Sequence, residues 1–296
     1  MKKILSKIDI QLFIMVILYI LLGLVMIYSA SSVTAVVRYG YQPYHFFIRQ
    51  AIFVLVAFFI GFFVILRFPT RNYALFTWPL IFLLIGSLAL LFVKGKIAGG
   101  AISWFDLKYF KVQPSEFAKI GLIIYVSKYL ANNNKLIKDI KKGVLPILLV
   151  IGTFFLLIML EPDLGTAMVI VITLVSILFI SGVKLSFFIK IGIVGLLGIV
   201  ALIIVAPYRM LRIVSFLNPW VDPLGSGYQI IQSLYAIGPG GLLGQGFLKS
   251  RQKQFYLPEP QTDFIFSIIS EEFGFLGILI VTAFFAFIFY RIIKIS

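Results

Sequence analysis

Residues 186–206 read SFFIKIGIVGLLGIVALIIVA, and this stretch decides the class of the fold. An apolar run of about 20 residues is long enough to cross a hydrocarbon core about 30 Å thick as an α-helix. Such runs recur along the chain, in which 61% of the 296 residues are hydrophobic and 12% are charged. Ordinary soluble domains contain roughly 25% charged residues. The sequence therefore predicts an integral membrane protein built of helices.

Eight membrane-spanning helices are predicted, which makes the fold an all-α polytopic helix bundle in a single domain, residues 1–296. The predicted helices cover residues 10–30, 47–66, 75–93, 115–131, 144–160, 164–181, 186–206 and 263–290. The first apolar run follows several lysines, as in a signal peptide, but it is longer than the usual run of about 7–15 residues. We expect it to be retained as a helix.

The basic residues predict the orientation of the chain in the membrane. An N-terminus in the cytoplasm places one group of basic residues in short cytoplasmic connectors or at cytoplasmic helix ends. This group contains Arg67, Arg71, Lys135, Lys138, Lys141, Lys142, Lys184, Lys190, Arg291 and Lys294. Short cytoplasmic connectors are typically rich in Lys and Arg, and basic residues beside a membrane also contact anionic lipid. The pI near 9.9 is therefore attributed to topology and membrane lipid, not to nucleic acid.

Most acidic residues map to the opposite, extracytoplasmic side. They are Asp106, Glu116, Glu161, Asp163, Asp222, Glu259 and Asp263 in loops or at helix ends, with Glu271 and Glu272 in the outer half of the last helix. Acidic residues contribute little to topology, so insertion does not explain this distribution. Charges within a membrane usually face a cavity or a partner. We expect a polar cavity that opens to the outer face.

Residues 207–262 are predicted to form a large extracytoplasmic loop between the seventh and eighth helices. Loops of this length are uncommon unless they carry function. Asp222 stands in an Asp-Pro-x-Gly turn, where its side chain could simply bond to its own backbone. Residues 228–237 are predicted to form a short surface helix, and the glycines of 238–246 to give flexibility or a close approach to a ligand.

Three alternating basic residues, Lys249, Arg251 and Lys253, follow in the same loop. Alternation would place them on one side of an extended segment. Such a side can be solvated or contact lipid headgroups. On the extracytoplasmic face, where basic residues are not expected from topology, it is also suited to an anionic substrate.

Two shorter motifs lie at outer helix ends. In QPSEFAK (113–119), Glu116 and Lys119 share a helix face and can form an ion pair, which leaves either a capped helix start or a site where Lys119 serves an anionic ligand. In EPDLGTA (161–167), Glu161 and Asp163 stand in one tight turn. Two such carboxylates tend to raise one pKa or to need a cation, although Asp163 could also act only as a helix cap.

Metal and disulfide chemistry are restricted by composition. The chain has no Cys and one His, which excludes disulfides and thiolate metal sites and disfavours a His-rich centre. We predict no protein metal site. A divalent cation, Mg²⁺ or Mn²⁺, bridging a carboxylate and a substrate pyrophosphate is left open.

These motifs, in this order, resemble the SEDS family (shape, elongation, division and sporulation), which contains FtsW, RodA and SpoVE. The resemblance spans nearly the whole chain and rests on GLVMIYSAS (23–31), on the two short motifs and above all on residues 207–274. NPWVDPLGSGYQIIQSLYAIGPGGL and FYLPEPQTDFIF are more similar to the division and sporulation branch than to the RodA branch. Family members usually have ten spans, so the chain is expected to lack the last two. Restoring these two C-terminal helices is expected to raise polymerisation activity.

The resemblance implies a peptidoglycan glycosyltransferase in the cytoplasmic membrane of a bacterium. Such enzymes polymerise lipid II, an undecaprenyl-pyrophosphate-linked disaccharide, into β-1,4 glycan at the outer face, together with a class B penicillin-binding protein. The resemblance implies that Asp222 is the essential loop aspartate. It also implies that Glu116, Lys119 and Asp163 line the substrate cavity.

The chemistry of the residues agrees with this function. Pyrophosphate leaves without protonation, so one base for the acceptor hydroxyl and positive charge on the leaving group are sufficient. We predict Asp222 as the general base, and Glu161 and Gln229 as further substrate contacts. The predicted pyrophosphate contacts are Lys119, Arg209, Arg212, Lys249, Arg251 and Lys253. The alternatives are a lipid II flippase, which would need a polar path across the bilayer, and a non-catalytic scaffold that recruits a cell-wall synthase.

Overall fold

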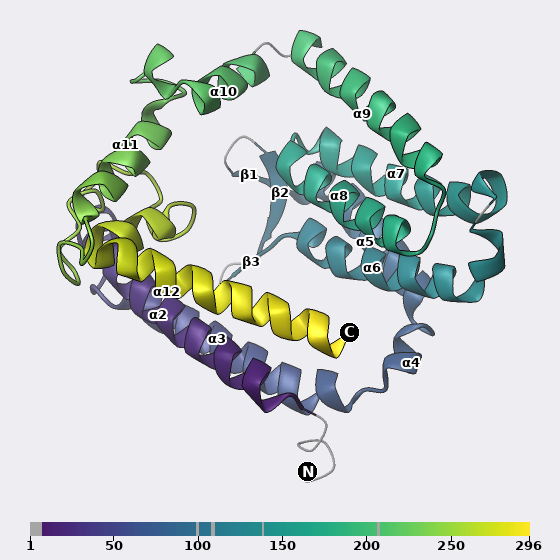
Figure 1. Cartoon of the computed structure of the whole chain (residues 1–296), viewed down its shortest axis with the longest axis horizontal. Coiled ribbons are helices and arrows are strands. Elements are labelled where there is room, and N and C mark those ends of the chain that lie inside the picture. Colours follow the sequence, from purple (N-terminus) through teal and green to yellow (C-terminus); the bar gives the residue numbers. More distant parts are fainter. Residues whose placement is uncertain (1–7, 99–100, 108–109, 138, 206–207) are drawn as a thin grey trace. The chain divides into compact units, whose positions relative to one another are not determined.

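The structure is a computed structural model that describes residues 8–98, 101–107, 110–137, 139–205 and 208–296. Lys138, one of the predicted cytoplasmic basic residues, and position 207, the start of the predicted large loop, lie outside these residues. The chain forms two compact units, which are described separately. The first unit contains Met1–Arg67 with Ala201–Ser296, and the second contains Phe68–Val200. Figure 1 labels their elements.

All eight predicted helices are present. They are α2 (Ile10–Tyr39), α3 (His45–Phe63), α5 (Thr77–Lys94), α6 (Pro114–Asn132), α7 (Leu145–Leu160), α8 (Leu164–Ile180), α9 (Leu185–Val205) and α12 (Ile265–Ile295). Among the described residues, five helices are long and apolar enough to cross a membrane: α2, α3, α5, α7 and α12, where α3 and α7 are counted with the helical turns that adjoin them. The prediction of an all-helical membrane fold is confirmed.

Helix α2 is longer than predicted. Its predicted end lies near residue 30, close to the polar run SASS, but the helix continues to Tyr39. The hydroxyl of Ser31 donates to the carbonyl of Ile27 at 2.7 Å, and that of Ser32 to the carbonyl of Ser29 at 3.1 Å. Because serine hydroxyls satisfied in this way do not disturb the helix, it ends only at Gly40, which has a left-handed φ of 66°.

In the second unit, helices α5 to α9 surround one apolar core. Leu88, Leu122, Phe154 and Leu174 are almost completely buried in it. A small antiparallel sheet that the sequence analysis did not predict lies between α5 and α6. It consists of β1 (Lys96–Ala98), β2 (Ala101–Asp106) and β3 (Lys111–Val112). The short helix α4 (Thr70–Tyr73) precedes α5.

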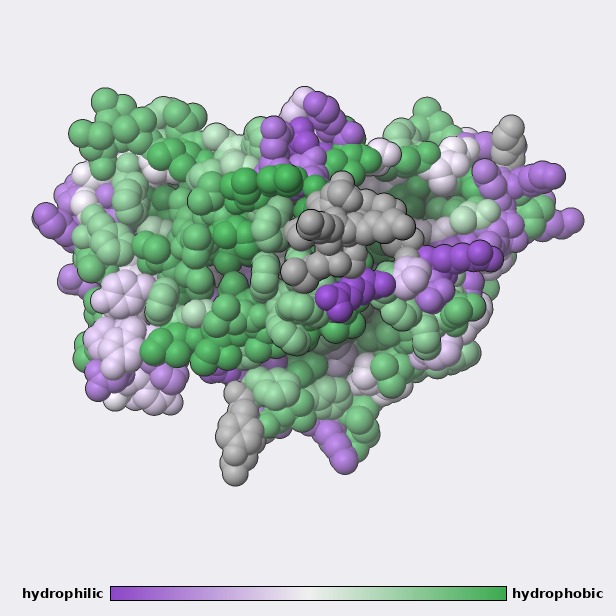
Figure 2. Space-filling model, turned by 90° about the horizontal axis from the view of Figure 1, so that it is seen from below, coloured by the Kyte–Doolittle hydropathy of each residue, from purple (hydrophilic) through white to green (hydrophobic). Residues whose placement is uncertain are grey.

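In the first unit, α2 packs between α3 and α12 (Figure 1). Asp9 at the start of α2 pairs with Arg291 near the end of α12, and Ser29 bonds to Glu272 near its start. The two helices are therefore antiparallel. Among the described residues, α3 has no buried side chain, and its surface is almost wholly apolar. Hydrophobic side chains likewise dominate the face drawn in Figure 2, as expected for helices that contact lipid.

The large loop contains more regular structure than predicted. It includes α10 (Tyr208–Leu217) and α11 (Tyr228–Ile237), with single 3-10 turns at Pro219–Val221 and Gly238–Gly240. The predicted helix at 228–237 is confirmed, whereas α10 was not predicted. Residues 247–264 have no long regular element.

Candidate active site

Asp222 closes a tight turn in the large loop. One carboxylate oxygen accepts a hydrogen bond from the Gly225 amide at 3.1 Å. The other accepts from the Ser226 amide at 2.7 Å and from the Ser226 hydroxyl at 3.0 Å. The turn that the sequence predicted is therefore present, and its carboxylate is bonded to its own backbone.

Two glycines make this turn possible. A β-carbon at position 225 would lie 2.2 Å from an Asp222 carboxylate oxygen, and one at position 227 would lie 2.0 Å from the Pro219 carbonyl oxygen. Both distances are shorter than any van der Waals contact. The motif DPLGSG therefore requires small residues because its backbone folds tightly around the carboxylate.

The hydrogen bonds around Asp222 keep it ionised. The amide and hydroxyl of Ser226 lower the pKa of the Asp222 carboxyl below its usual value; partial desolvation opposes this shift, and the amide of Gly225 adds a smaller lowering. Hydrogen bonds to the charged form of a carboxyl favour that form. Asp222 is consequently an anion at neutral pH.

A pocket of about 660 Å³ lies beside this turn. Gly225 and Ser226, the two residues that bond to Asp222, contribute to its wall. The remaining lining residues are Arg212, Phe216, Leu224, Tyr228, Gln229, Ile230 and Pro258. Two predicted substrate contacts, Arg212 from α10 and Gln229 from α11, are thus brought together next to the predicted base.

The other basic residues of the loop do not form one surface. The segment around Lys249, Arg251 and Lys253 consists of turns, so the expectation of an extended segment with three cations on one side is wrong. Lys249 and Arg251 are exposed, whereas the Lys253 side chain is 2% exposed. Arg209 belongs to α10, but the structure does not describe its side chain.

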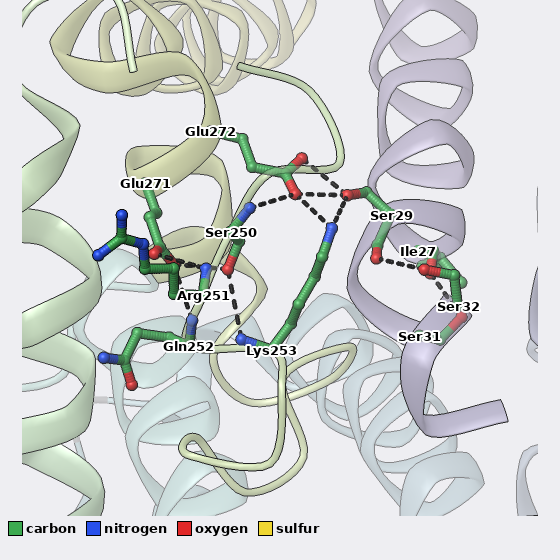
Figure 3. A network of polar contacts seen from close by, with 10 residues as sticks. All are labelled: Ile27, Ser29, Ser31, Ser32, Ser250, Arg251, Gln252, Lys253, Glu271 and Glu272. Atoms are coloured by element: carbon green, nitrogen blue, oxygen red, sulfur yellow. Dashed lines mark hydrogen bonds and ion pairs between the residues drawn. The ribbon is translucent and has the colours of Figure 1, made fainter. Parts of the chain in front are cut away.

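Lys253 belongs to a buried polar cluster that the sequence analysis missed (Figure 3). Its ammonium group lies 2.7 Å from a carboxylate oxygen of Glu272 and 3.1 Å from the Ser29 hydroxyl. The prediction of a pyrophosphate contact at Lys253 is corrected, because this charge is already neutralised inside the protein. The signal in the sequence was the pair Glu271–Glu272 within an apolar helix, since buried carboxylates require partners.

The glycine-rich segment 238–246, which was predicted to give flexibility or a close approach to a ligand, packs closely against helix α12. Helix α12 is interrupted at Gly274, which has φ 63° and ψ −156°. The carbonyl oxygens of Glu271 and Glu272 therefore accept from the loop amides of Gln245 and Gly246, at 2.8 and 3.0 Å. In return, the amides of Phe275 and Leu276 donate to the carbonyls of Gly241 and Leu242, at 2.8 and 3.2 Å. The loop thereby satisfies the backbone groups that the kink leaves free.

In the second unit, the motifs at 113–119 and 161–167 lie together. The side-chain amide of Gln113 donates to Asp163 at 3.2 Å, and Asp163 also caps α8 by accepting from the backbone amide of Thr166 at 3.1 Å. Lys119 and Glu116 form the predicted ion pair, with a shortest distance of 2.8 Å. Both side chains are partly exposed, so this pair alone contributes little to stability.

Glu161 is the most unusual acid of the described part of the chain. It has no exposed surface, and no residue of the described ranges forms a hydrogen bond with either carboxylate oxygen. Burial, and then the charge of Asp163, raise the pKa of Glu161 to about 7, against which the nearby Ser103 hydroxyl acts weakly. This agrees with the expectation that two carboxylates in one turn raise a pKa.

Within the described residues, no group of three or more His, Cys, Asp and Glu could hold a metal ion. Glu161 and Asp163 offer at most two carboxylates in one place. Mg²⁺ is often bound by one or two carboxylates together with substrate phosphates, so these residues fit only a cation that arrives with its substrate.

Comparison with known proteins identifies relatives over the whole chain. A family model named FTSW_RODA_SPOVE and described as "Cell cycle protein" matches residues 9–296. Stage V sporulation protein E of Bacillus subtilis (strain 168) is 43% identical over 297 residues, which cover 97% of this chain and 79% of that protein. A probable peptidoglycan glycosyltransferase FtsW of Aliivibrio salmonicida (strain LFI1238) is 41% identical, over 88% of this chain and 65% of that protein. The chain thus spans about two thirds to four fifths of these relatives.

Solved structures share the fold. A chain from the structure described as "Structural coordination of polymerization and crosslinking by a peptidoglycan synthase complex" is 28% identical with a TM-score of 0.73. The match covers 96% of this chain and 77% of that chain. The crystal structure of the rod shape determining protein RodA of Thermus thermophilus is 24% identical with a TM-score of 0.60, over 96% of this chain and 74% of that chain. The long apolar helices and these relatives together make the chain a multi-pass membrane protein.

Proposed function

Because this chain belongs to the FtsW, RodA and SpoVE family, we propose that it is a peptidoglycan glycosyltransferase that polymerises lipid II into β-1,4 glycan. Relatives that are 36–41% identical carry the name probable peptidoglycan glycosyltransferase FtsW, which supports the class of reaction. The single observation that carries the assignment to residues is the turn of Asp222. This ionised carboxylate is bonded to two residues that line a pocket together with Arg212 and Gln229.

In the proposed reaction, Asp222 is the general base. An acceptor sugar hydroxyl attacks the anomeric carbon of the donor, the bond from that carbon to the pyrophosphate oxygen breaks, and the electron pair leaves with the pyrophosphate. Asp222 receives the hydroxyl proton. A carboxylate of lowered pKa is a weak base, but it is fully ionised, and the hydroxyl becomes acidic only as the new bond forms. A good leaving group therefore makes a weak base sufficient.

Positive charge is needed where the pyrophosphate departs. Arg212 stands in the pocket wall, and Lys119, Arg209, Lys249 and Arg251 remain proposed contacts for the phosphates of the substrate. Glu116 and Asp163 are proposed to contact substrate in the second unit. The predicted contact at Glu161 is corrected, because this side chain has no exposed surface. A divalent cation that arrives with the pyrophosphate would neutralise its charge in the same way.

We also propose that the chain works at the extracytoplasmic face of a bacterial cytoplasmic membrane with a class B penicillin-binding protein. A partner of this kind is supported by the similar chain from a peptidoglycan synthase complex, which joins polymerisation to cross-linking. The role in division or sporulation is supported by the relatives named FtsW and stage V sporulation protein E.

The test uses the purified chain, lipid II in detergent and gel detection of glycan polymer. We expect polymer from the natural chain and a loss of at least about 10²-fold in rate from Asp222→Asn, the low end of what a general base contributes. The matched control is Asp139→Asn. The Asp139 carboxylate caps a turn predicted to be cytoplasmic by accepting from two backbone amides.

Other outcomes would contradict the proposal. An Asp222→Asn variant that polymerises at the natural rate removes Asp222 from the mechanism. A natural chain that moves lipid II across liposome membranes but makes no polymer supports a flippase. A chain that does neither, but binds a penicillin-binding protein, supports a scaffold.

A further inference from the structure

Hydrogen bonds and one ion pair connect the loop that carries Asp222 to two helices. Five buried side chains form these contacts: Ser29 of α2, Ser250 and Lys253 of the loop, and Glu271 and Glu272 of α12. We call these five residues the buried clamp, and Figure 3 shows them together. We infer that they are positioning residues, which fix residues 250–257 of the loop and thereby set the place of the Asp222 turn. This inference extends the proposed function and rests on it only for the activity measurement.

The first half of the clamp is an ion pair between the loop and α12, to which a serine of α2, more than 200 positions away in the sequence, is hydrogen-bonded. Lys253 and Glu272 pair at 2.7 Å, with side chains 2% and 0% exposed. The Ser29 hydroxyl lies 2.6 and 2.7 Å from the two oxygens of Glu272. A buried charge without a partner is strongly unfavourable, so these three groups hold one another in place.

The second half is a carboxylate that organises a turn. Glu271 accepts from the Ser250 hydroxyl at 2.5 Å and from the backbone amides of Arg251 and Gln252, at 2.8 and 3.3 Å. These donors compensate the second negative charge without a second cation. Since two of the donors are amides, Glu271 fixes the backbone of the loop and not only its side chains.

A short series of contacts connects the clamp to the Asp222 turn. After Lys253 the chain turns, with the Leu257 amide bonded to the Gln252 carbonyl at 2.9 Å. The Leu257 side chain is buried in a small apolar core with Met26 and Ile268. The Tyr256 carbonyl then accepts from the Tyr228 hydroxyl at 2.8 Å.

Tyr228 is the first residue of α11, and the preceding amide of Gly227 donates to the Asp222 carbonyl at 3.0 Å. Tyr228 also lines the pocket. The clamp therefore acts on the candidate site through α11. Its own side chains are buried, so they act without touching substrate.

The first measurement is the accessibility of an engineered thiol, and it is independent of any reaction. The chain has no cysteine, so Leu257→Cys introduces a single buried thiol just beyond the clamp. In this background, Lys253→Met and Glu272→Gln each leave a buried charge without its partner. We expect a maleimide to label the thiol at least about tenfold faster in either variant, because local opening of the loop becomes easier.

Three further variants complete this measurement. Lys294→Met removes an exposed lysine from the other end of α12 and is expected to leave labelling unchanged. The double variant Lys253→Met, Glu272→Gln removes both charges and is expected to label more slowly than either single variant. If the single variants cannot be purified, Ser29→Ala is measured in their place, because it removes only a neutral hydroxyl. We expect it to raise the rate of maleimide labelling several-fold. Equal labelling in the natural and clamp variants would overturn the inference.

The second measurement is the rate of polymerisation per folded protein. A positioning role predicts that Lys253→Met lowers kcat at least about tenfold, because a misplaced base loses transition-state stabilisation, while KM changes little. Tyr228→Phe removes the hydrogen bond from the Tyr228 hydroxyl to the Tyr256 carbonyl, which connects the clamp to α11. It is therefore expected to lower kcat as Lys253→Met does, but to leave the labelling of the thiol unchanged.

A raised KM at unchanged kcat would instead mean that Lys253 binds substrate directly, and it would refute the positioning role. The proposed function and this inference fail in different measurements. Absence of polymer from the natural chain refutes the former, and unchanged thiol labelling refutes the latter.

Discussion

The backbone of Gly244 lies directly against the backbone of Gly274: a β-carbon on Gly274 would be 2.5 Å from the Gly244 nitrogen. This contact joins the glycine-rich part of the loop to the kink of α12. No residue other than glycine fits either position, since both also have a positive φ, 80° and 63°. The loop and the last helix are therefore a single structural element, in which each satisfies the backbone of the other.

The first prediction concerns this contact. Gly244→Ala should destabilise the protein by at least about 2 kcal/mol, because the new methyl group would lie 2.2 Å from the Glu272 carbonyl oxygen and the φ of 80° is unfavourable for alanine. The matched control is Gly238→Ala, where φ is −57° and nothing lies within 4 Å of the new β-carbon. Thermal unfolding in detergent measures both. Equal melting temperatures for the two variants would show that the loop can separate from α12 at no cost.

The second prediction concerns the pH dependence of the proposed base. Ser226→Ala removes one of the hydrogen bonds that lower the pKa of Asp222, so this pKa should rise towards its ordinary value. A base acts only in its ionised form, and the acidic limb of the polymerisation rate should therefore move to higher pH. The rate of both proteins is measured from pH 3.5 to 7, with Ser176→Ala, an exposed helix hydroxyl, as the control. An acidic limb that does not move would argue that Asp222 supports the turn and takes no proton.

The third prediction concerns Glu161. Its pKa is about 7 in the folded protein and 4.5 for the ordinary group, so between these values the folded state binds more protons. Stability should be greatest below about pH 4.5 and decrease as the pH rises through 7, by a few kcal/mol at most. Glu161→Gln should abolish this decrease and melt at a higher temperature than the natural chain at pH 8. If the natural chain is equally stable at pH 5 and pH 8, the pKa of Glu161 is not raised, and the prediction is wrong.

The fourth prediction separates ligand binding from stability at Lys119. Lys119 and Glu116 form a partly exposed pair three residues apart, which contributes about 0.2–0.5 kcal/mol in a helix. Lys119→Met should therefore leave the melting temperature almost unchanged. If Lys119 contacts the pyrophosphate, the same variant should lower kcat/KM at least about tenfold. The control is Lys128→Met. The Lys128 ammonium group donates to the Ala74 carbonyl and forms no part of the proposed site. An unchanged kcat/KM for Lys119→Met would show that Lys119 only pairs with Glu116 on the helix surface and does not contact the pyrophosphate.

Much of the fold could be predicted because membrane helices obey a simple rule. A span needs about 20 apolar residues, and its length and composition show directly in the sequence. The end of α2 was misplaced because serine hydroxyls, which often end helices, can also bond within one. The small sheet was missed because strands of two to six residues leave too weak a pattern.

The candidate site was predicted in part. The Asp222 turn, the pair Glu116–Lys119 and the helix cap at Asp163 are local features, formed by residues within four positions of one another. Local spacing is sufficient to predict them. Lys253 was misjudged because neither partner is a near neighbour in the sequence: Glu272 lies 19 positions away, and Ser29 lies more than 200 positions away.

Hydrophobicity and turn chemistry act between near neighbours, so the membrane helices and the turn that holds Asp222 could be predicted from the order of residues alone. Which polar groups are buried together depends on the folded chain. Glu271 and Glu272 look equivalent in the sequence, but one organises a loop backbone and the other pairs with a lysine. The physical reason is that the free energy of a buried charge depends on every group that surrounds it, and those groups are brought together only by folding.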